Sequence, residues 1–247
     1  MTGAASGIGL AVARLLLQDG WHVVLADANQ AGLDGLRQGE FAQVPEASMV
    51  LVDVTDEAAV RQAMRDIPAD RPLAGVVNSA GIGRSIPFAQ TTVEVLRGIF
   101  EVNVVGTFIV CQAAALAMGG RGGAIVNISS GSGLKANFGR AAYGSSKAAV
   151  EMLSKVMAVE FAPRGIRVNT VAPGPIETPM VTKMHTDADR RAALGTVPMR
   201  RYGQPDEVAQ AVTFLLDTER ASFITGETLC VDGGFYAAGA FPPADST

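Results

Sequence analysis

Thr2-Gly3-Ala4-Ala5-Ser6-Gly7-Ile8-Gly9 is a glycine-spaced turn that leads directly into a helical pattern. Glycine permits a tight turn and lets the backbone approach a pyrophosphate, whose charge the N-terminus of a helix stabilises. The spacing is GxxxGxG, which is related to the better-known GxGxxG pattern but differs from it. The turn therefore predicts a phosphate-binding loop, and a glycine-rich turn without a ligand is the alternative.

Short β-branched runs alternate with longer helical patterns along the rest of the chain. We expect strands at residues 23–25, 49–52, 75–77, 124–128, 168–171 and 228–231. We expect helices at residues 7–19, 91–118, 143–161 and 205–216, the second with Thr91 and Glu94 as a capping box. This alternation predicts an α/β fold, a doubly wound parallel sheet with helices on both faces.

The composition indicates one domain over residues 1–247, with a loose tail at 240–247. The chain is 48% hydrophobic, and its net charge of -4 disfavours nucleic acid as a partner. Cys111 and Cys230 lie in apolar segments without metal-ligand spacing, so we expect no metal site, no disulfide framework and a reducing cytoplasm. No stretch approaches the roughly 18 uncharged apolar residues of a membrane span, so we expect no membrane partner.

Asp27 ends the first predicted strand, 18 residues after Gly9. A carboxylate at this position accepts hydrogen bonds from the adenosine ribose hydroxyls and repels a 2′-phosphate. Neither Ala26 nor Ala28 supplies a cation for such a phosphate. The sequence therefore favours NAD over NADP, with a simple turn-capping role for Asp27 as the alternative.

Tyr143 and Lys147 are four residues apart on a predicted helix, so they share one face. Tyrosine has a pKa near ~10, and lowering it by about two units requires roughly 2.7 kcal/mol. A cation about 4 Å away, at an effective dielectric of about 20, supplies ~4 kcal/mol. We expect Lys147, helped by an oxidised nicotinamide, to let Tyr143 act as an acid/base near neutral pH. An interfacial tyrosine beside a solvated lysine is the alternative.

Together these motifs resemble the short-chain dehydrogenase/reductase family in its NAD-preferring form, from Thr2 to about Phe235. The resemblance implies a Rossmann-like fold, a homotetramer and hydride transfer between NAD and a secondary alcohol or ketone. The matching pieces are the glycine turn, Asp27, Asp53-Val54, Asn78-Ser79-Ala80-Gly81, Asn103, Ser130, Tyr143 with Lys147, Pro173-Gly174-Pro175-Ile176-Glu177-Thr178 and Asp232-Gly233-Gly234.

The resemblance also assigns roles. Ser130 hydrogen-bonds the substrate oxygen, Tyr143 transfers its proton, and Lys147 holds the nicotinamide ribose. Asn103 interrupts the backbone hydrogen bonds of its helix and holds a water molecule that relays protons. The alternative for Asn103 is a polar residue that bonds only within the core.

The resemblance also assigns contacts to the cofactor. Asp53 approaches the adenine, Val54 packs on it, and Ile176 and Thr178 fix the carboxamide. The full expected cofactor set is Gly3, Ser6, Gly7, Ile8, Gly9, Asp27, Asp53, Val54, Asn78, Ala80, Gly81, Tyr143, Lys147, Pro173, Gly174, Ile176 and Thr178.

The family has a β-strand immediately before the glycine turn, whereas Gly3 is the third residue of this sequence. That strand lies in the middle of the sheet, and without it buried backbone groups lose their partners. We therefore expect the natural protein to begin several residues upstream.

Residues 179–202 are expected to form a mobile amphipathic lid over the substrate. The expected substrate contacts are Ser130, Ser132, Phe138, Tyr143, Met180 and Met184, whereas His185 is interpreted as a surface residue. Mixed polar and apolar walls favour a polyol, a sugar or a small cyclic alcohol. Two alternatives remain: a 3-oxoacyl-thioester reductase, with Arg121 and Arg164 attracting an acidic carrier protein, and a non-catalytic NAD-sensing protein.

Overall fold

The structure, a computed structural model, describes residues 1–239. The expected tail at 240–247 and the side chain of Met184 lie outside the described residues. β1 (Val23–Asp27) pairs in parallel with β2 (Ala47–Leu51). A second parallel set has the order β3 (Gly75–Asn78), β4 (Gly123–Ile128), β5 (Ile166–Pro173) and β6 (Thr228–Val231). The predicted α/β fold with a parallel sheet is confirmed.

Thr2 joins the two sets of strands. It forms single parallel bridges to Ala26, within β1, and to Asn78, at the end of β3. The amino group of Met1 donates to the Val24 carbonyl over 2.7 Å. Residues 1 and 2 thus lie where the resembled fold has its central strand. At the other end of β3, a Cβ on Gly75 would lie 3.2 Å from Leu216 and 3.6 Å from Trp21, so apolar side chains pack closely there.

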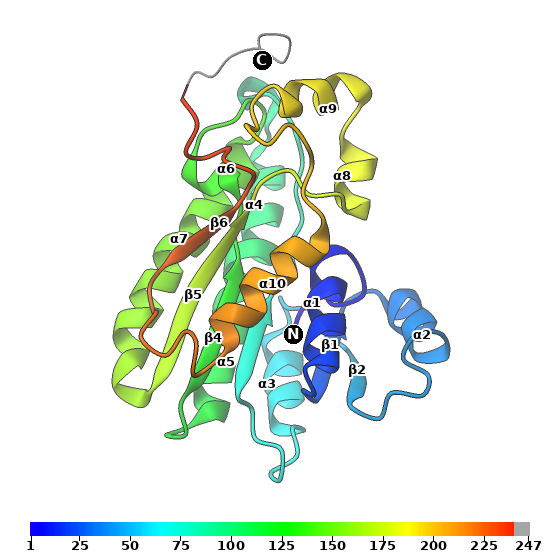
Figure 1. Cartoon of the computed structure of the whole chain (residues 1–247), viewed down its shortest axis with the longest axis vertical. Helices are drawn as coiled ribbons and strands as arrows, with labels where there is room; N and C mark the ends of the chain where they lie inside the picture. Colours follow the sequence, from blue (N-terminus) through cyan, green and yellow to red (C-terminus); the bar gives the residue numbers. More distant parts are fainter. Residues whose placement is uncertain (240–247) are drawn as a thin grey trace.

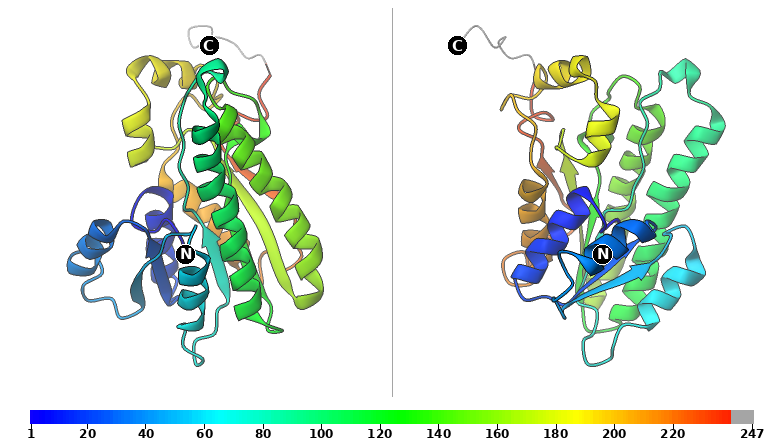
Figure 2. Two further views of the ribbon diagram at one scale, coloured as in Figure 1. Left: turned by 180° about the vertical axis from the view of Figure 1, so that it is seen from behind. Right: turned by 90° about the vertical axis from the view of Figure 1, so that its right-hand side faces the viewer.

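Helices cover both faces of the sheet. α1 (Gly7–Gln18) and α10 (Pro205–Leu216) pack side by side on the face toward the viewer in Figure 1. α3 (Glu57–Arg65), α5 (Gly106–Met118) and α7 (Ala141–Phe161) cover the opposite face, seen in the left view of Figure 2. Each face has its own apolar core, centred on Leu25 and Leu215 in one case and on Met118 and Ile125 in the other. α2 (Gln30–Gln38) lies beside β1 and β2.

The long helix expected at residues 91–118 is interrupted. α4 (Val93–Phe100) begins two residues after the predicted start at residue 91, because the side chain of Thr92, and not of Thr91, accepts the hydrogen bond from the Val95 amide. A π-helical turn, η2 (Glu101–Val105), then separates α4 from α5 and places Asn103 in the core.

Together α4, η2 and α5 form a continuous helical stretch, Val93–Met118, that by length and mean hydropathy alone would suffice to cross a membrane. The expectation that no segment approaches this limit was wrong. However, 56% of the apolar window is buried within the fold. The apolar character of the stretch is therefore that of a core helix.

The remaining elements gather near the carboxyl ends of the strands. α6 (Gly131–Leu134) follows β4, while α8 (Pro179–Met184) and α9 (Asp187–Leu194) follow β5. Figure 1 shows α8 and α9, in yellow, above the ends of the strands. Two short 3₁₀ turns, η1 (Phe88–Gln90) and η3 (Ala162–Arg164), complete the elements of the described part.

Candidate active site

A cleft of ≈ 420 Å³ opens at the carboxyl ends of the strands and extends from the glycine turn to Tyr143. Ligands of open parallel sheets bind at this edge. Most of the predicted cofactor residues line the cleft: Gly3, Ser6, Gly7, Ile8, Asp27, Asp53, Val54, Ala80, Gly81, Tyr143, Lys147, Pro173, Gly174, Ile176 and Thr178. Gly9 and Asn78 lie outside this lining.

The glycine turn depends on backbone geometry and on close packing. Gly3 and Gly7 have φ of 63° and 55°, a region that favours glycine. Gly9 has a different role, because a Cβ there would lie 2.0 Å from the Gly3 carbonyl oxygen. The absence of a side chain at Gly9 allows α1 to start directly under the turn and to direct its N-terminus at the cleft.

Replacing Gly9 with Ala is therefore expected to displace the turn and to lower the free energy of unfolding by about 1–3 kcal/mol, the usual cost of overpacking. Thermal unfolding followed by circular dichroism measures this loss. Gly35→Ala is the matched control, because Gly35 is in helix α2 and a Cβ there meets no atom within 4 Å. A Gly9→Ala variant as stable as Gly35→Ala would contradict this account of the turn.

Two carboxylates lie at the end of the cleft away from Tyr143. Asp27 accepts hydrogen bonds from the backbone amides of Ala5 and Asn29, both over 2.9 Å. The bond from Ala5 ties the end of β1 to the glycine turn. Asp53 accepts from the amide and the hydroxyl of Thr55 on one oxygen. The side chains of both aspartates are thus held in place while they line the cleft.

Asn78 belongs to a buried polar cluster behind the cleft. Its Nδ2 donates to Asn127 Oδ1 over 2.8 Å and to Cys111 Sγ over 3.1 Å. Asn127 in turn donates to Ser154 Oγ. The side chain of Asn78 thus links β3, β4, α5 and α7, which places it inside the sheet and not along the cleft as expected.

Ser130, Tyr143 and Lys147 converge at the other end of the cleft. Lys147 is only 5% exposed, and its Nζ donates to the Ile128 carbonyl over 2.8 Å and lies 5.9 Å from the centre of the Tyr143 ring. Burial lowers the pKa of Lys147 to about 8, opposed by the charge of Glu151 one helical turn away. Glu151 is itself buried and accepts a hydrogen bond from Thr228.

Burial also raises the pKa of Tyr143. The Ser130 hydroxyl and the charge of Arg140 act in the opposite direction, whereas Lys147 is not among the groups that lower it. The expectation that Lys147, helped by an oxidised nicotinamide, lowers this pKa concerns the cofactor-bound enzyme and stays a prediction. Desolvation of the phenolate outweighs the favourable contacts, and Arg140, three residues before Tyr143, was not foreseen from the sequence.

Asn103 holds the loop that covers Tyr143 and Lys147. Its side chain exchanges hydrogen bonds with both backbone groups of Ile82, and its Nδ2 also donates to Ser146 Oγ over 3.0 Å. A Cβ on Gly81 would lie 3.4 Å from Lys147 Nζ, and one on Gly83 would lie 3.0 Å from the Tyr143 ring. Sequence reasoning missed Ser146 and Gly83, although the Gly81-Ile82-Gly83 spacing is a signal of such a close approach.

The predicted substrate residues are spread over a wider area. Met180 lines the cleft beside Thr178. Ser132 lies beside Ser130, to whose hydroxyl its amide donates, while Phe138 is 87% exposed, and neither lines the cleft. In residues 1–239, with the side chain of Met184 left aside, no group of three or more His, Cys, Asp or Glu side chains is arranged to hold a metal ion.

Comparisons with known proteins agree with this architecture. A family profile described as enoyl-(acyl carrier protein) reductase matches residues 3–236. Galactitol 2-dehydrogenase (L-tagatose-forming) of Cereibacter sphaeroides is 41% identical over 95% of this chain and 93% of its own length. Cyclopentanol dehydrogenase of Comamonas testosteroni is 42% identical over 96% of both chains. Among solved structures, ElxO with NADP bound is 33% identical with a TM-score of 0.88, covering 96% of this chain and 97% of its own.

The chain belongs to the short-chain dehydrogenase/reductase family, and it has the fold of that family. It is an oxidoreductase that acts on an alcohol or a ketone with a nicotinamide cofactor.

Proposed function

We propose that this enzyme transfers a hydride between NAD and a secondary alcohol or its ketone, with a polyol, a sugar or a small cyclic alcohol as substrate. The convergence of Ser130, Tyr143 and Lys147 at one end of a cleft that begins at a glycine turn carries the proposal. Relatives that act on galactitol and on cyclopentanol support the substrate class.

The residues of the cleft fit a dinucleotide. Gly7 has a positive φ that favours glycine and lines the cleft near Thr178, so backbone and not a side chain faces the cleft at this point. Ser6, Gly7 and Ile8 would hold the pyrophosphate at the N-terminus of α1, and Ile176 and Thr178 would hold the carboxamide. The bound cofactor supplies the position that takes up or returns the hydride.

The proton is handled by the chain's own residues. Ser130 Oγ accepts the Ser132 amide over 3.1 Å, and its own hydrogen, which faces the Tyr143 hydroxyl in this structure, would turn to the substrate oxygen when substrate binds. In oxidation, the proton of the substrate hydroxyl passes to the Tyr143 phenolate as the C–H hydride leaves; in reduction, the phenol returns it. Lys147 would hold the ribose of the bound cofactor, and Asn103 fixes the loop next to both Tyr143 and Lys147.

NAD is proposed over NADP because of Asp27. Its carboxylate is held by two backbone amides at the point where a ribose would lie, and Ala28 beside it also lines the cleft. The related ElxO binds NADP, so the proposal of NAD rests on Asp27 and not on membership of the family.

A 3-oxoacyl-thioester reductase is the alternative, favoured by 38% identity to 3-oxoacyl-[acyl-carrier-protein] reductase FabG of Thermotoga maritima. The arginines expected to attract a carrier protein bind backbone instead: Arg121 donates to the Ala117 carbonyl and Arg164 to that of Ala115. Both carbonyls are near the C-terminus of α5, where a cation is stabilising.

A substrate screen tests the proposal. Purified enzyme is incubated with NAD or NADP and galactitol, xylitol, cyclopentanol or a 3-hydroxyacyl thioester, and reduced cofactor is followed by absorbance. We expect turnover with NAD and a polyol or cyclic alcohol. Turnover with the thioester alone would select the alternative, and NADPH formation exceeding NADH formation would refute the role of Asp27.

We also propose a cytoplasmic homotetramer. Large apolar side chains are exposed along α5 and α7, namely Phe108, Leu116, Met152, Val156 and Val159. Exposed apolar side chains, where they adjoin on a surface, are typical of a protein–protein interface. Sedimentation velocity should give four times the mass of 25.5 kDa, and Val159→Glu should reduce the assembly state. A wild-type monomer would contradict this.

A further inference from the structure

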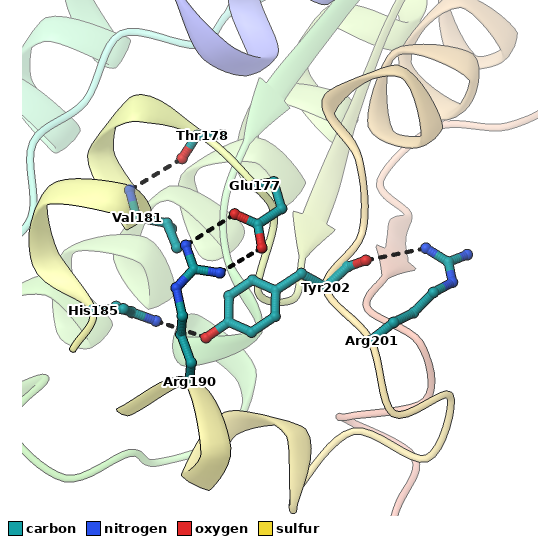
Figure 3. Close-up of polar contacts among 7 residues, drawn as sticks. All are labelled: Glu177, Thr178, Val181, His185, Arg190, Arg201 and Tyr202. Atoms are coloured by element: carbon teal, nitrogen blue, oxygen red, sulfur yellow. Dashed lines mark hydrogen bonds and ion pairs between the residues drawn. The ribbon is translucent and has the colours of Figure 1, made fainter. Parts of the chain in front are cut away.

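A polar cluster joins the two helices of the lid to the segment before α10. Figure 3 shows the Glu177 carboxylate facing the Arg190 guanidinium, with the Tyr202 ring beside it. The two ion-pair contacts are 2.6 and 3.0 Å long, and the guanidinium lies 4.9 Å from the ring centre. His185, after α8, approaches the Tyr202 hydroxyl with Nδ1 over 2.9 Å.

His185 also contacts the catalytic end of the cleft. Its Nε2 lies 3.3 Å from Arg140 Nη2, and the Arg140 guanidinium lies 5.7 Å from the centre of the Tyr143 ring. A chain of contacts therefore runs from the lid through His185 and Arg140 to Tyr143. His185 is half-buried, so it lies at the surface with part of its ring enclosed.

These two neighbours determine which nitrogen of His185 carries the proton. A guanidinium only donates, so Nε2 must be the acceptor opposite Arg140. Nδ1 then carries the hydrogen and donates it to the Tyr202 hydroxyl. A second proton on His185 would place an N–H and a positive charge directly against Arg140, and the contact would be lost.

We propose that neutral His185 is a positioning residue that latches the lid to Arg140 and so holds the guanidinium beside Tyr143. Closure of the lid and the acidity of Tyr143 are thereby coupled. The latch, which is the contact between His185 and Arg140, is lost when His185 is protonated. The role of His185 in turnover rests on the proposed function. The contact between His185 and Arg140 does not, because it needs neither substrate nor cofactor.

The surroundings of His185 support a latch that is closed near neutral pH. Arg140 and Arg190 face it with positive charge, and Asp189 and Glu177 with negative charge, while Tyr202 is its neutral partner. Burial and then Arg140 lower the pKa of His185 below its usual 6.5. Because the folded protein disfavours the protonated form, the latch is intact above that lowered pKa and is lost as the pH falls through it.

Hydrogen exchange of the full chain, without substrate or cofactor, tests the latch. Amides in residues 179–202 of the wild type should lose protection at acid pH, by about tenfold after correction for intrinsic rates. His185→Leu should be equally unprotected at every pH. His185→Gln keeps an acceptor for Arg140 but does not titrate, so it should remain protected in acid. Equal pH dependence in wild type and His185→Gln would overturn the proposal.

Kinetics then test the coupling to Tyr143. His185→Leu should raise KM about tenfold and shift the pH profile of kcat for alcohol oxidation upward, because Arg140 no longer stays where it lowers the pKa of Tyr143. Arg191→Ala is the control, since Arg191 is exposed on the same helix as Arg190 and should leave KM and the profile unchanged. An unchanged profile in His185→Leu would overturn the coupling. Failure to find any substrate would count against the proposed function but would leave the exchange result standing.

Discussion

Replacing Tyr143 with Phe should lower kcat for alcohol oxidation by about 10²–10⁴-fold, the range that general acid/base catalysis contributes. The substitution removes one oxygen, and the ring remains packed against Gly83 and below Arg140. Lys147 keeps its hydrogen bond to the Ile128 carbonyl, which does not involve the phenol. NADH binding, measured by fluorescence titration, should therefore stay close to that of the wild type. The loss should appear in kcat alone.

Tyr236→Phe is the matched control for this prediction, because Tyr236 is half exposed and does not line the cleft. It should retain full activity. A Tyr143→Phe enzyme that keeps more than about a tenth of the wild-type kcat would show that another group transfers the proton. Loss of NADH binding together with activity would indicate a structural role instead. The same two variants distinguish an enzyme from a protein that only senses NAD. The physiological effect of a sensor would be unchanged in Tyr143→Phe, whereas an enzyme would lose NADH production.

Much of the fold follows from local sequence patterns. The β-branched runs gave the six strands to within a few residues, and Pro205 marked the start of α10. The shift from Thr91 to Thr92 arose because both threonines can cap a helix, and the Thr91 hydroxyl donates instead to the carbonyls of Ile86 and Pro87. The family resemblance implied that Asn103 interrupts the hydrogen bonding of its helix, and a π-helical turn lies at that position. These features are readable because each depends on a few neighbouring residues.

The site was less predictable where contacts join distant segments. His185 and Arg140 are 45 residues apart in sequence, and nothing near either residue shows that they meet. Asn78 has the spacing of a cofactor residue, but its direction depends on Asn127 and Cys111 from other elements. The pKa of Tyr143 is hard to predict from sequence for a related reason. The spacing to Lys147 shows a nearby cation, whereas the burial that opposes it depends on the whole fold.

Replacing Asp27 with Asn, together with Ala28→Arg, should reverse the cofactor preference. Hydrogen bonds from ribose hydroxyls to a carboxylate contribute about 1.5–3 kcal/mol, so their weakening lowers kcat/KM for NAD by about 10–100-fold. Removing a negative charge about 4 Å from a 2′-phosphate, at an effective dielectric of about 20, relieves ~4 kcal/mol of repulsion, and the new arginine adds attraction. The ratio of kcat/KM for NAD to that for NADP should fall by at least about 10²-fold.

The structure also predicts what this substitution disturbs. Asp27 accepts from both Ala5 and Asn29, and an asparagine can accept at one of its two positions only. Some loss of stability is therefore expected, and unfolding curves must accompany the kinetics. Asp34→Asn is the control, since Asp34 is an exposed carboxylate of α2 outside the cleft lining. If the Asp27 variant folds and still prefers NAD by the wild-type ratio, the carboxylate does not select the cofactor, and its function is to tie β1 to the glycine turn.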